Sequence, residues 1–486
     1  MNPITGTRAL ARRNSNGLLV LVCLAQYMVI LDVSIVNVAL PAIHDDLSFS
    51  TTGLQWVVNA YTLTFAGFLM LGGRASDLLG RRRVFLGGTA LFVLASLTCA
   101  VAGSQAVLLG ARALQGVGAA IISPASLAII ATSFDEGRDR NRALGVWGAM
   151  AGLGGSSGVL LGGVLTQGVG WPAIFLINVP IGLAVVLLGP RVVPEGRAEG
   201  VTKHFDATGA ILVTAGLTAL VYGIVRTDTL GWGAPGVLAP LALGVVLLAL
   251  FAIVEGKLSP APLMPLRIFR MPRLRSANLV VILLYSGFFA MWFFLSLYLQ
   301  QVRHDGALET GFAFLPMTLA IVAASSFAPR LVARFGIRNV ITAGMLSATA
   351  GLALFTNLTP GSSYVTLFLP AGLLAAVGLG FSLVPATIAA VQGVPAAQSG
   401  LASGVLNTSR LVGGALGLAV LSTLATSRTD SRLADGVATL QAHTDGYQLA
   451  FAVGAGLCLL GGIAAVTLMG RRAEAPTAAF AEERAA

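Results

Sequence analysis

The chain has 486 residues, of which 56% are hydrophobic and only 10% are charged. A soluble domain carries roughly 25% charged residues, so most of this chain faces something other than water. The formal charge of +10 does not indicate nucleic-acid binding, because the basic residues stand in short connectors between apolar runs. Three dispersed cysteines and four isolated histidines predict neither a disulfide framework nor a metal site.

Apolar runs recur along the whole chain, each about as long as the twenty residues that a helix needs to cross a bilayer. Such runs become helices, because lipid offers no hydrogen bonds to the backbone. The sequence therefore predicts an all-α polytopic membrane protein with fourteen spans. We place them at residues 18–40, 54–73, 84–102, 106–131, 142–165, 173–190, 207–225, 236–255, 277–300, 309–329, 339–356, 364–387, 399–424 and 447–469.

The spans predict four parts of the chain. Residues 1–190 form a first six-helix bundle, and residues 191–275 hold two additional helices with polar connectors. Residues 276–470 form a second six-helix bundle, followed by a tail at 471–486.

The connectors predict the orientation of these spans. When the N-terminus is placed inside, most of the 30 basic residues fall in inward segments. The predicted outward loops hold only Arg226, Arg303, Arg428 and Arg432. Because basic residues stay on the cytoplasmic side, we expect a multi-pass protein of the bacterial inner membrane with both termini cytoplasmic. The longest outward loop is expected at about 425–446.

The connector after the second predicted span reads GRASDLLGRRR. It resembles the loop signature of the major facilitator superfamily, G-x-x-x-D-x-x-G-R-R, at Gly73, Asp77, Gly80, Arg81 and Arg82. The resemblance implies that Asp77 faces the N-terminus of the helix that begins near Ser399, an end that favours an anion. This contact would latch the cytoplasmic side shut.

The matching connector of the second bundle, PRLVARFGIR, is a weaker copy of the same loop. Gly336 and Arg338 fit the pattern, but Ala333 stands where the first loop has Asp77. A decayed copy is typical of an internally duplicated transporter, and it assigns the gating role to the first loop.

Three further stretches narrow the family: LDVSIVNVALP at 31–41, LGARALQGVGAA at 109–120 and GWPAIFLINVPIG at 170–182. All three resemble the fourteen-span branch of the drug:proton antiporters, and the resemblance covers essentially the whole chain. It implies the major facilitator fold, with two six-helix bundles plus two extra helices. It also implies export of drugs, antibiotics or similar amphipathic molecules in exchange for protons by alternating access. We expect no cofactor, a proton gradient as energy source, and function as a monomer.

Asp32 is the one acidic residue deep in a predicted span, and a charge at the bilayer centre is costly enough to indicate function. Asp32 lies roughly 12 Å and Arg112 roughly 9 Å below the outer ends of their helices. At similar depth the two charges can pair if their helices pack together. The pair either fixes helix packing only, or switches Asp32 between binding and releasing a proton as it moves. In the family the matching residues are implicated in coupling, so we expect Asp32→Asn to stay folded and to lose proton-coupled export.

Arg410 lies about 16 Å from the predicted cytoplasmic end of its helix, close to the midplane. No acidic residue of the second half lies deep enough to pair with it. Three roles stay open: pairing across the cavity with Asp32, binding backbone carbonyls, or attracting an anionic group of the substrate.

The fifth predicted span contains glycines at a four-residue spacing, Gly154, Gly158 and Gly162, which lets another helix approach closely. We predict a gating role for this face, although static packing would produce the same pattern. A related face in the second half is a candidate for a second contact between the bundles. It consists of Ser409, Gly413 and Gly417.

The antiporter signature of the family places a Gly-Pro-x-x-Gly-Gly core at this point of the fifth span. Gly158, Gly162 and Gly163 fit the core, but Val159 stands where the family has proline. This departure weakens the inference that the chain is an antiporter and does not transport its cargo in another direction.

A site for bulky amphipathic molecules needs apolar walls and a few polar anchors. Each aromatic candidate below has the alternative role of packing or facing lipid. The candidate substrate-binding residues are Gln26, Tyr27, Asn37, Asn59, Tyr61, Gln115, Trp147, Tyr285, Trp292, Asn407 and Arg410.

Two enzyme motifs are excluded. The string GGSSG matches a hydrolase pattern at Ser156, but it lies in an apolar helix without the required strand, turn and histidine. No phosphate-binding G-x-x-x-x-G-K-[ST] string occurs, so we expect no nucleotide partner. Two alternatives to drug export stay open: transport of a defined physiological cargo, such as a lipid, siderophore or endogenous metabolite, and a non-transporting membrane sensor. The Asp32, Arg112 and 73–83 signatures count against the sensor.

Overall fold

In the computed structural model the chain folds into long helices. The structure describes residues 3–134, 138–195, 206–259, 262, 266–392 and 399–469. Fourteen helical stretches of this part of the chain are long and apolar enough to cross a membrane, which confirms the predicted number.

The α-helices are α1 (Pro3–Leu47), α2 (Thr51–Leu79), α3 (Arg81–Ala100), α4 (Gln105–Ser133), α5 (Arg138–Gly168), α6 (Ala173–Leu176), α7 (Asn178–Val192), α8 (Ala207–Leu230), α9 (Pro235–Ile253), α10 (Pro272–Leu297), α11 (Ala307–Phe335), α12 (Ile337–Phe355), α13 (Leu369–Val391), α14 (Ser399–Ala434) and α15 (Thr439–Leu468). Short π-helical turns at Val254–Leu258, Tyr298–Val302 and Tyr364–Phe368 and a 3-10 turn at Leu266–Arg270 complete them.

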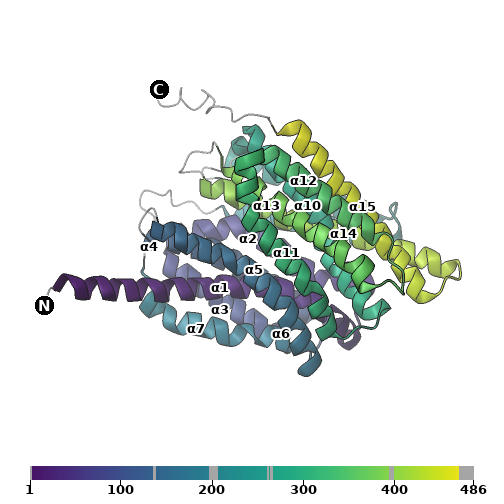
Figure 1. Ribbon diagram of the computed structural model, residues 1–486, viewed down its shortest axis with the longest axis horizontal. Coiled ribbons are helices and arrows are strands. Elements are labelled where there is room, and N and C mark those ends of the chain that lie inside the picture. Colours follow the sequence, from purple (N-terminus) through teal and green to yellow (C-terminus); the bar gives the residue numbers. More distant parts are fainter. Residues whose placement is uncertain are drawn as a thin grey trace.

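The helices pack as two bundles with a pair of helices between them. Helices α1 to α7 form the first bundle and α10 to α15 the second, and α5 lies beside α11 where the bundles meet (Figure 1). The additional helices α8 and α9 form a hairpin, and α8 packs on both α2 and α14. The additional pair therefore contacts both bundles.

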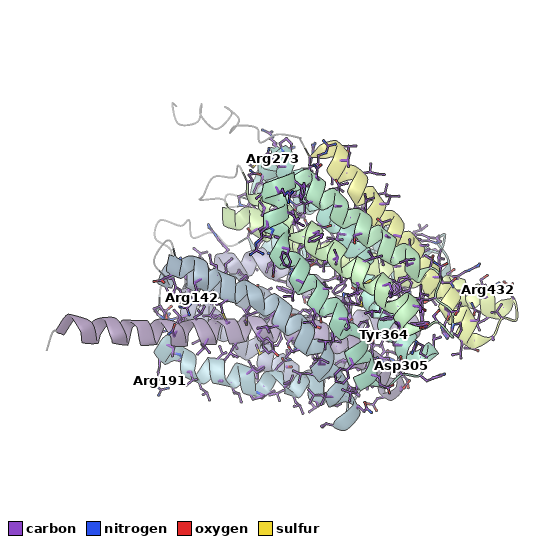
Figure 2. The ribbon with its side chains drawn as sticks, viewed as in Figure 1. Arg142, Arg191, Arg273, Asp305, Tyr364 and Arg432 are labelled. Atoms are coloured by element: carbon purple, nitrogen blue, oxygen red, sulfur yellow. The ribbon has the colours of Figure 1, made fainter. Side chains whose placement is uncertain are left out.

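The two ends of this helical body carry different side chains (Figure 2). We name the end that holds Arg142, Arg191 and Arg273 the basic face. We name the other end, which holds Asp305, Tyr364 and Arg432, the far face.

Matching turns at the basic face relate the two bundles. Gly80 separates α2 from α3 with φ of 105°, and Gly336 separates α11 from α12 with φ of 81°. This left-handed region is one that glycine adopts at little steric cost. Both connectors therefore turn at a glycine with positive φ, as expected if the two halves arose by duplication.

The predicted bounds of the outward loop, 425–446, are wrong. Helix α14 continues to Ala434 and α15 already begins at Thr439, so the connector is short. The helices continue beyond the apolar region because charged groups stabilise their ends. Arg432 Nε donates to Asp445 Oδ2 at 2.6 Å, and Gln441 Nε2 donates to Asp445 Oδ1 at 2.6 Å. Hydropathy marks where lipid ends, whereas a helix ends where its backbone loses partners.

The bundles touch closely near the far face. A Cβ on Gly163 of α5 would lie 2.6 Å from the carbonyl oxygen of Ala307 on α11. Ser296 Oγ donates to the Asn37 carbonyl at 2.6 Å, and Gln300 Nε2 donates to the Val38 carbonyl at 3.0 Å. These contacts join the second bundle to α1 of the first.

Candidate functional site

An ion pair lies inside the first bundle. Arg112 Nη1 of α4 donates to Asp32 Oδ2 of α1 at 2.5 Å, and both side chains are fully buried. The two helices bring the charges together at the similar depth estimated from the sequence. Taking both charges out of water is expensive, so a pair of this kind needs further hydrogen bonds around it.

Two uncharged side chains supply hydrogen bonds to the carboxylate, and a third supports them. Gln115 Nε2 donates to Asp32 Oδ1 at 2.7 Å, and Asn178 Nδ2 donates to the same oxygen at 3.0 Å. Both amides also donate to Ser96 Oγ, at 3.2 Å and 3.1 Å respectively. The carboxylate on α1 is thus held by groups from α4 and α7, and Ser96 of α3 accepts hydrogen bonds from the two amides that hold it.

Arg112 has contacts that do not involve the carboxylate. Its Nε donates to the Val57 carbonyl of α2 at 2.9 Å, and its Nη1 donates to Gln115 Oε1 at 2.7 Å. Its Cζ lies 4.4 Å from the ring centre of Tyr61. A guanidinium over an aromatic face is stabilised by the ring's negative charge density. Arg112 is therefore anchored to α2 and α4 by contacts that do not depend on Asp32.

Arg410 of α14 lies in different surroundings in the second bundle. Its Cζ lies 5.6 Å from the ring centre of Tyr285 on α10. Among the described residues no carboxylate lies within ion-pair distance of Arg410, so the structure does not pair it with Asp32. Its side chain is partly exposed, in contrast to the sealed Arg112.

The predicted gating loop is visible only in part. The side chain of Asp77 and that of Ser399 lie outside the described residues, so the expected latch is a prediction that the structure does not address. Gly73 lies on α2 with a Cβ position 3.5 Å from Pro124 of α4.

The arginines of the same loop turn toward α7. Arg82 Nε donates to Glu195 Oε2 at 3.1 Å, and its Nη1 donates to the Pro190 carbonyl at 3.3 Å. Arg81, the first residue of α3, precedes this contact. The basic part of the loop thus fastens α3 to the end of α7 within one bundle.

The glycine face of α5 packs on α1. A Cβ on Gly154 would lie 2.9 Å from Ile30, one on Gly158 2.7 Å from Ser34 Cβ, and one on Gly162 2.8 Å from the Ile35 carbonyl. These distances leave no room for larger residues. The face joins two helices of one bundle, and its neighbour Gly163 makes one of the contacts between the bundles.

The second face of small residues does not join the bundles, contrary to prediction. Gly413 and Gly417 approach the backbone of α10 at Ile282 and Ser286. Ser409 Oγ donates to Asn278 Oδ1 of the same helix at 2.7 Å. The face therefore packs α14 on α10 inside the second bundle.

The candidate substrate-binding residues fall into separate groups. Tyr61 and Gln115 belong to the surroundings of the ion pair. Trp292 packs on Phe314 with ring centres 4.7 Å apart. Asn407 is exposed and donates to the Ser403 carbonyl at 3.1 Å. Among the described residues, these side chains make separate sets of contacts.

The candidates on α1 and α5 make local hydrogen bonds. Tyr27 Oη lies 2.7 Å from Ser157 Oγ, and Asn37 Nδ2 donates to the Val33 carbonyl at 3.0 Å. Trp147 Nε1 of α5 donates to Ser126 Oγ of α4 at 2.9 Å. The bonds of Tyr27 and Trp147 join helices of the first bundle to one another, whereas that of Asn37 stays within α1.

Asn59 and Gln26 are buried with unpaired polar atoms. Both amide atoms of Asn59, and those of Gln55 one turn before it on α2, lack a hydrogen-bond partner among the described residues. Gln26 Oε1 likewise lacks one within the described chain. Buried amides without partners are uncommon in proteins, so these positions are suited to a polar group of a bound molecule.

Sequence reasoning missed Ser96, Asn178 and Gln55. Asn178 stands in the string 170–182, where its polar side chain in an apolar run was the available signal. Ser96 offered no signal, because serine is common in membrane helices where small residues pack closely.

The chain is similar to one known protein family and to several named relatives. The family model described as Major Facilitator Superfamily matches residues 22–418. The chain is 42% identical to the cephamycin export protein CmcT of Amycolatopsis lactamdurans, over 86% of each chain. It is 41% identical to the puromycin resistance protein pur8 of Streptomyces alboniger, over 94% of this chain and 92% of the relative.

Solved structures share the fold at low identity. An auto-inhibited peptide transporter of the POT family superposes with a TM-score of 0.67 at 14% identity, covering 95% of this chain and 99% of that one. A bacterial homologue of the human lysosomal transporter Spinster, inward-facing and unoccupied, gives a TM-score of 0.66 at 16% identity, with 95% and 99% covered. At such identities the likeness is one of architecture.

Proposed function

The chain belongs to the Major Facilitator Superfamily, and from that premise we propose that it exports antibiotics or similar small amphipathic molecules in exchange for protons. It is a multi-pass membrane transporter of small molecules and not an enzyme. In the proposed orientation the basic face and both termini meet the cytoplasm of a bacterium. The proton gradient supplies the energy, and a monomer without a cofactor performs the cycle.

The buried Asp32–Arg112 pair is the observation that carries this proposal. A carboxylate inside a membrane bundle that is paired, hydrogen-bonded and sealed from water is suited to hold a proton in one state and lose it in another. Export proteins among the relatives support the direction of transport. Val159, at the place of the expected proline, is the residue that counts against antiport.

The contacts of Arg112 suggest how protonation becomes motion. A protonated Asp32 no longer attracts the guanidinium as an ion, whereas the Val57 carbonyl and the Tyr61 ring still hold it. Asp32 stands on α1, which also bears the Asn37 and Val38 carbonyls that accept hydrogen bonds from the second bundle. Loosening α1 at Asp32 would therefore loosen the closed far face, which is the outer side in this orientation.

Everted membrane vesicles test the proposal. Vesicles that contain the protein should accumulate a fluorescent dye or an antibiotic when an imposed gradient makes their interior acidic. Collapse of the gradient with a protonophore should abolish accumulation, and vesicles without the protein give the baseline. Accumulation that ignores the protonophore would contradict proton coupling, and none across a broad panel would contradict drug export.

A second candidate is a transporter dedicated to one cargo. Two relatives are named for a single compound, cephamycin or puromycin, whereas another is named a multidrug resistance protein. The same vesicle panel separates these candidates. A dedicated transporter accumulates one chemical class, and a multidrug exporter accumulates several.

A further inference from the structure

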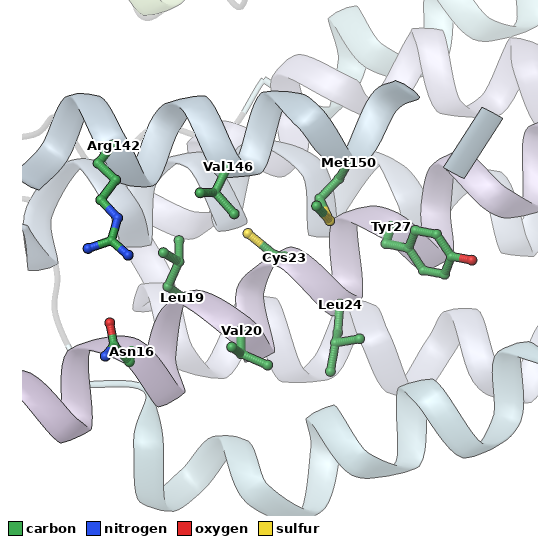
Figure 3. A pocket seen from close by; sticks show the side chains of 9 residues that line it. All are labelled: Asn16, Leu19, Val20, Cys23, Leu24, Tyr27, Arg142, Val146 and Met150. Carbon is green, nitrogen blue, oxygen red and sulfur yellow. The ribbon is translucent and has the colours of Figure 1, made fainter. Parts of the chain in front are cut away.

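A groove with a cavity volume of about 560 Å³ lies between α1 and the first half of α5 (Figure 3). Its walls are almost entirely apolar, with Leu19, Val20 and Leu24 from α1 and Val146 and Met150 from α5. The groove lies in the half of the molecule next to the basic face, outside the ion-pair site.

The groove opens toward lipid. The exposed fraction is 59% for Val20, 38% for Leu24 and 37% for Val146. On the neighbouring α7, Leu183 and Leu187 are exposed as well. In a chain that spans the membrane, an apolar surface of this kind contacts hydrocarbon.

The two ends of the groove differ in chemistry. At the basic face, the guanidinium of Arg142 and the amide of Asn16 extend toward the mouth from opposite helices (Figure 3). At the inner end, the hydrogen bond between Tyr27 and Ser157 joins the two helices at 2.7 Å. Just beyond it, Gly154 brings α5 against Ile30, so an occupant cannot pass between the helices.

We propose that this groove binds an anionic phospholipid of the leaflet at the basic face, with its phosphate on Arg142 and Asn16 and one acyl chain along α1. The path from Asn16 to Tyr27 is roughly 16 Å long, because a helix rises about 1.5 Å per residue. This matches one leaflet of a hydrocarbon core about 30 Å thick. Arginine binds phosphate through paired donors, and the closed inner end suits a resident lipid better than a cargo in transit.

Native mass spectrometry of the full chain tests the proposal, with phosphatidylglycerol and phosphatidylcholine as the added lipids. The wild type should bind phosphatidylglycerol in preference. Arg142→Gln should weaken that binding about fivefold, the contribution of one basic side chain at a membrane surface. Arg191→Gln is the matched control, because Arg191 is an exposed arginine of the same face on α7 that does not line the groove, and it should bind as the wild type does. Equal binding by the two variants would overturn the assignment.

A second variant tests the contribution of the acyl chain to binding separately from that of the headgroup. Val146→Trp fills the groove from an exposed position and keeps every arginine, so it should weaken phosphatidylglycerol binding at least as much as Arg142→Gln does. Wild-type binding by Val146→Trp would reduce the site to surface attraction and overturn the proposal. Displacement of the bound lipid by an exported antibiotic would also overturn it, because the groove would then hold cargo.

Discussion

The cores of the two bundles are built from different chemistry. The first encloses the ion pair of Asp32 and Arg112 within a set of amides and a hydroxyl. The second encloses aromatic rings whose centres lie 5.2 Å to 6.2 Å apart, at Phe293, Phe294, Phe355, Phe368 and Phe451.

This difference indicates a division of labour between halves of one fold. Phenylalanine rings pack closely and carry no titratable group, whereas a buried carboxylate can change its charge. The deep arginine of the second bundle lies on Tyr285 and is partly exposed. We therefore expect protonation to act on the first bundle, and the second to serve as the body against which it moves.

The largest difference between the two bundles should appear when the deep arginine of each is replaced. Arg112→Leu leaves Asp32 buried without its counter-charge, so the free energy of unfolding should fall by about 3–5 kcal/mol. Arg410→Leu loses only a contact with a ring, and its loss should stay below about 1 kcal/mol. Denaturant unfolding of both variants in one detergent gives the comparison. Equal losses would show that the two arginines play equivalent parts.

A smaller effect should follow from single core substitutions. Gln115→Leu removes a donor from Asp32 Oδ1 and should destabilise the protein by about 1–3 kcal/mol. Its control in the aromatic core is Phe355→Leu, which keeps an apolar side chain there and should lower stability by about 1 kcal/mol. Export assays across a range of pH then distinguish them, since only Gln115→Leu should shift the pH dependence. If the pH dependence of export shifted in Phe355→Leu instead, proton coupling would involve the second bundle, which would contradict the account.

The smallest effect on stability is expected from substitutions at the contact between α5 and α11, where the bundles meet. In Gly163→Ala the new Cβ would press on the Ala307 carbonyl, so the closed far face should become less populated. In Gly155→Ala nothing lies within 4 Å of the new Cβ, which makes it the control on the same helix. Spin labels on α5 and α11 report the separation. Unfolding free energies should change by less than about 1 kcal/mol in both variants, and equal separations would contradict the role of this contact.

The sequence predicted the features that depend on charge and hydropathy. Apolar runs revealed the spans, and depth along two helices placed Asp32 and Arg112 at one level. Hydropathy could not locate the ends of α14 and α15, because Arg432 and Asp445 extend the helices into the polar region.

The neutral part of the site could not be predicted in the same way. Asn178 reaches the carboxylate, and Ser96 reaches the amide of Asn178, only because α7 and α3 pack beside α1 and α4. Their side chains carry no charge, and polar residues of this kind also serve in ordinary helix packing. Likewise, the spacing of small residues around Gly413 predicts a close helix contact, but it does not identify the helix that makes the contact.

Transport by Asp32→Asn in proteoliposomes tests the central claim most directly. The variant keeps a side chain of similar size, and Arg112 keeps its contacts with Val57 and Tyr61, so a folded protein is expected. Circular dichroism and size-exclusion chromatography check this first. The account predicts that the variant still exchanges cargo across the membrane with no gradient applied. It also predicts that the variant fails to accumulate cargo when a pH gradient is imposed. Accumulation at the wild-type rate under that gradient would contradict Asp32 as the proton-coupling residue.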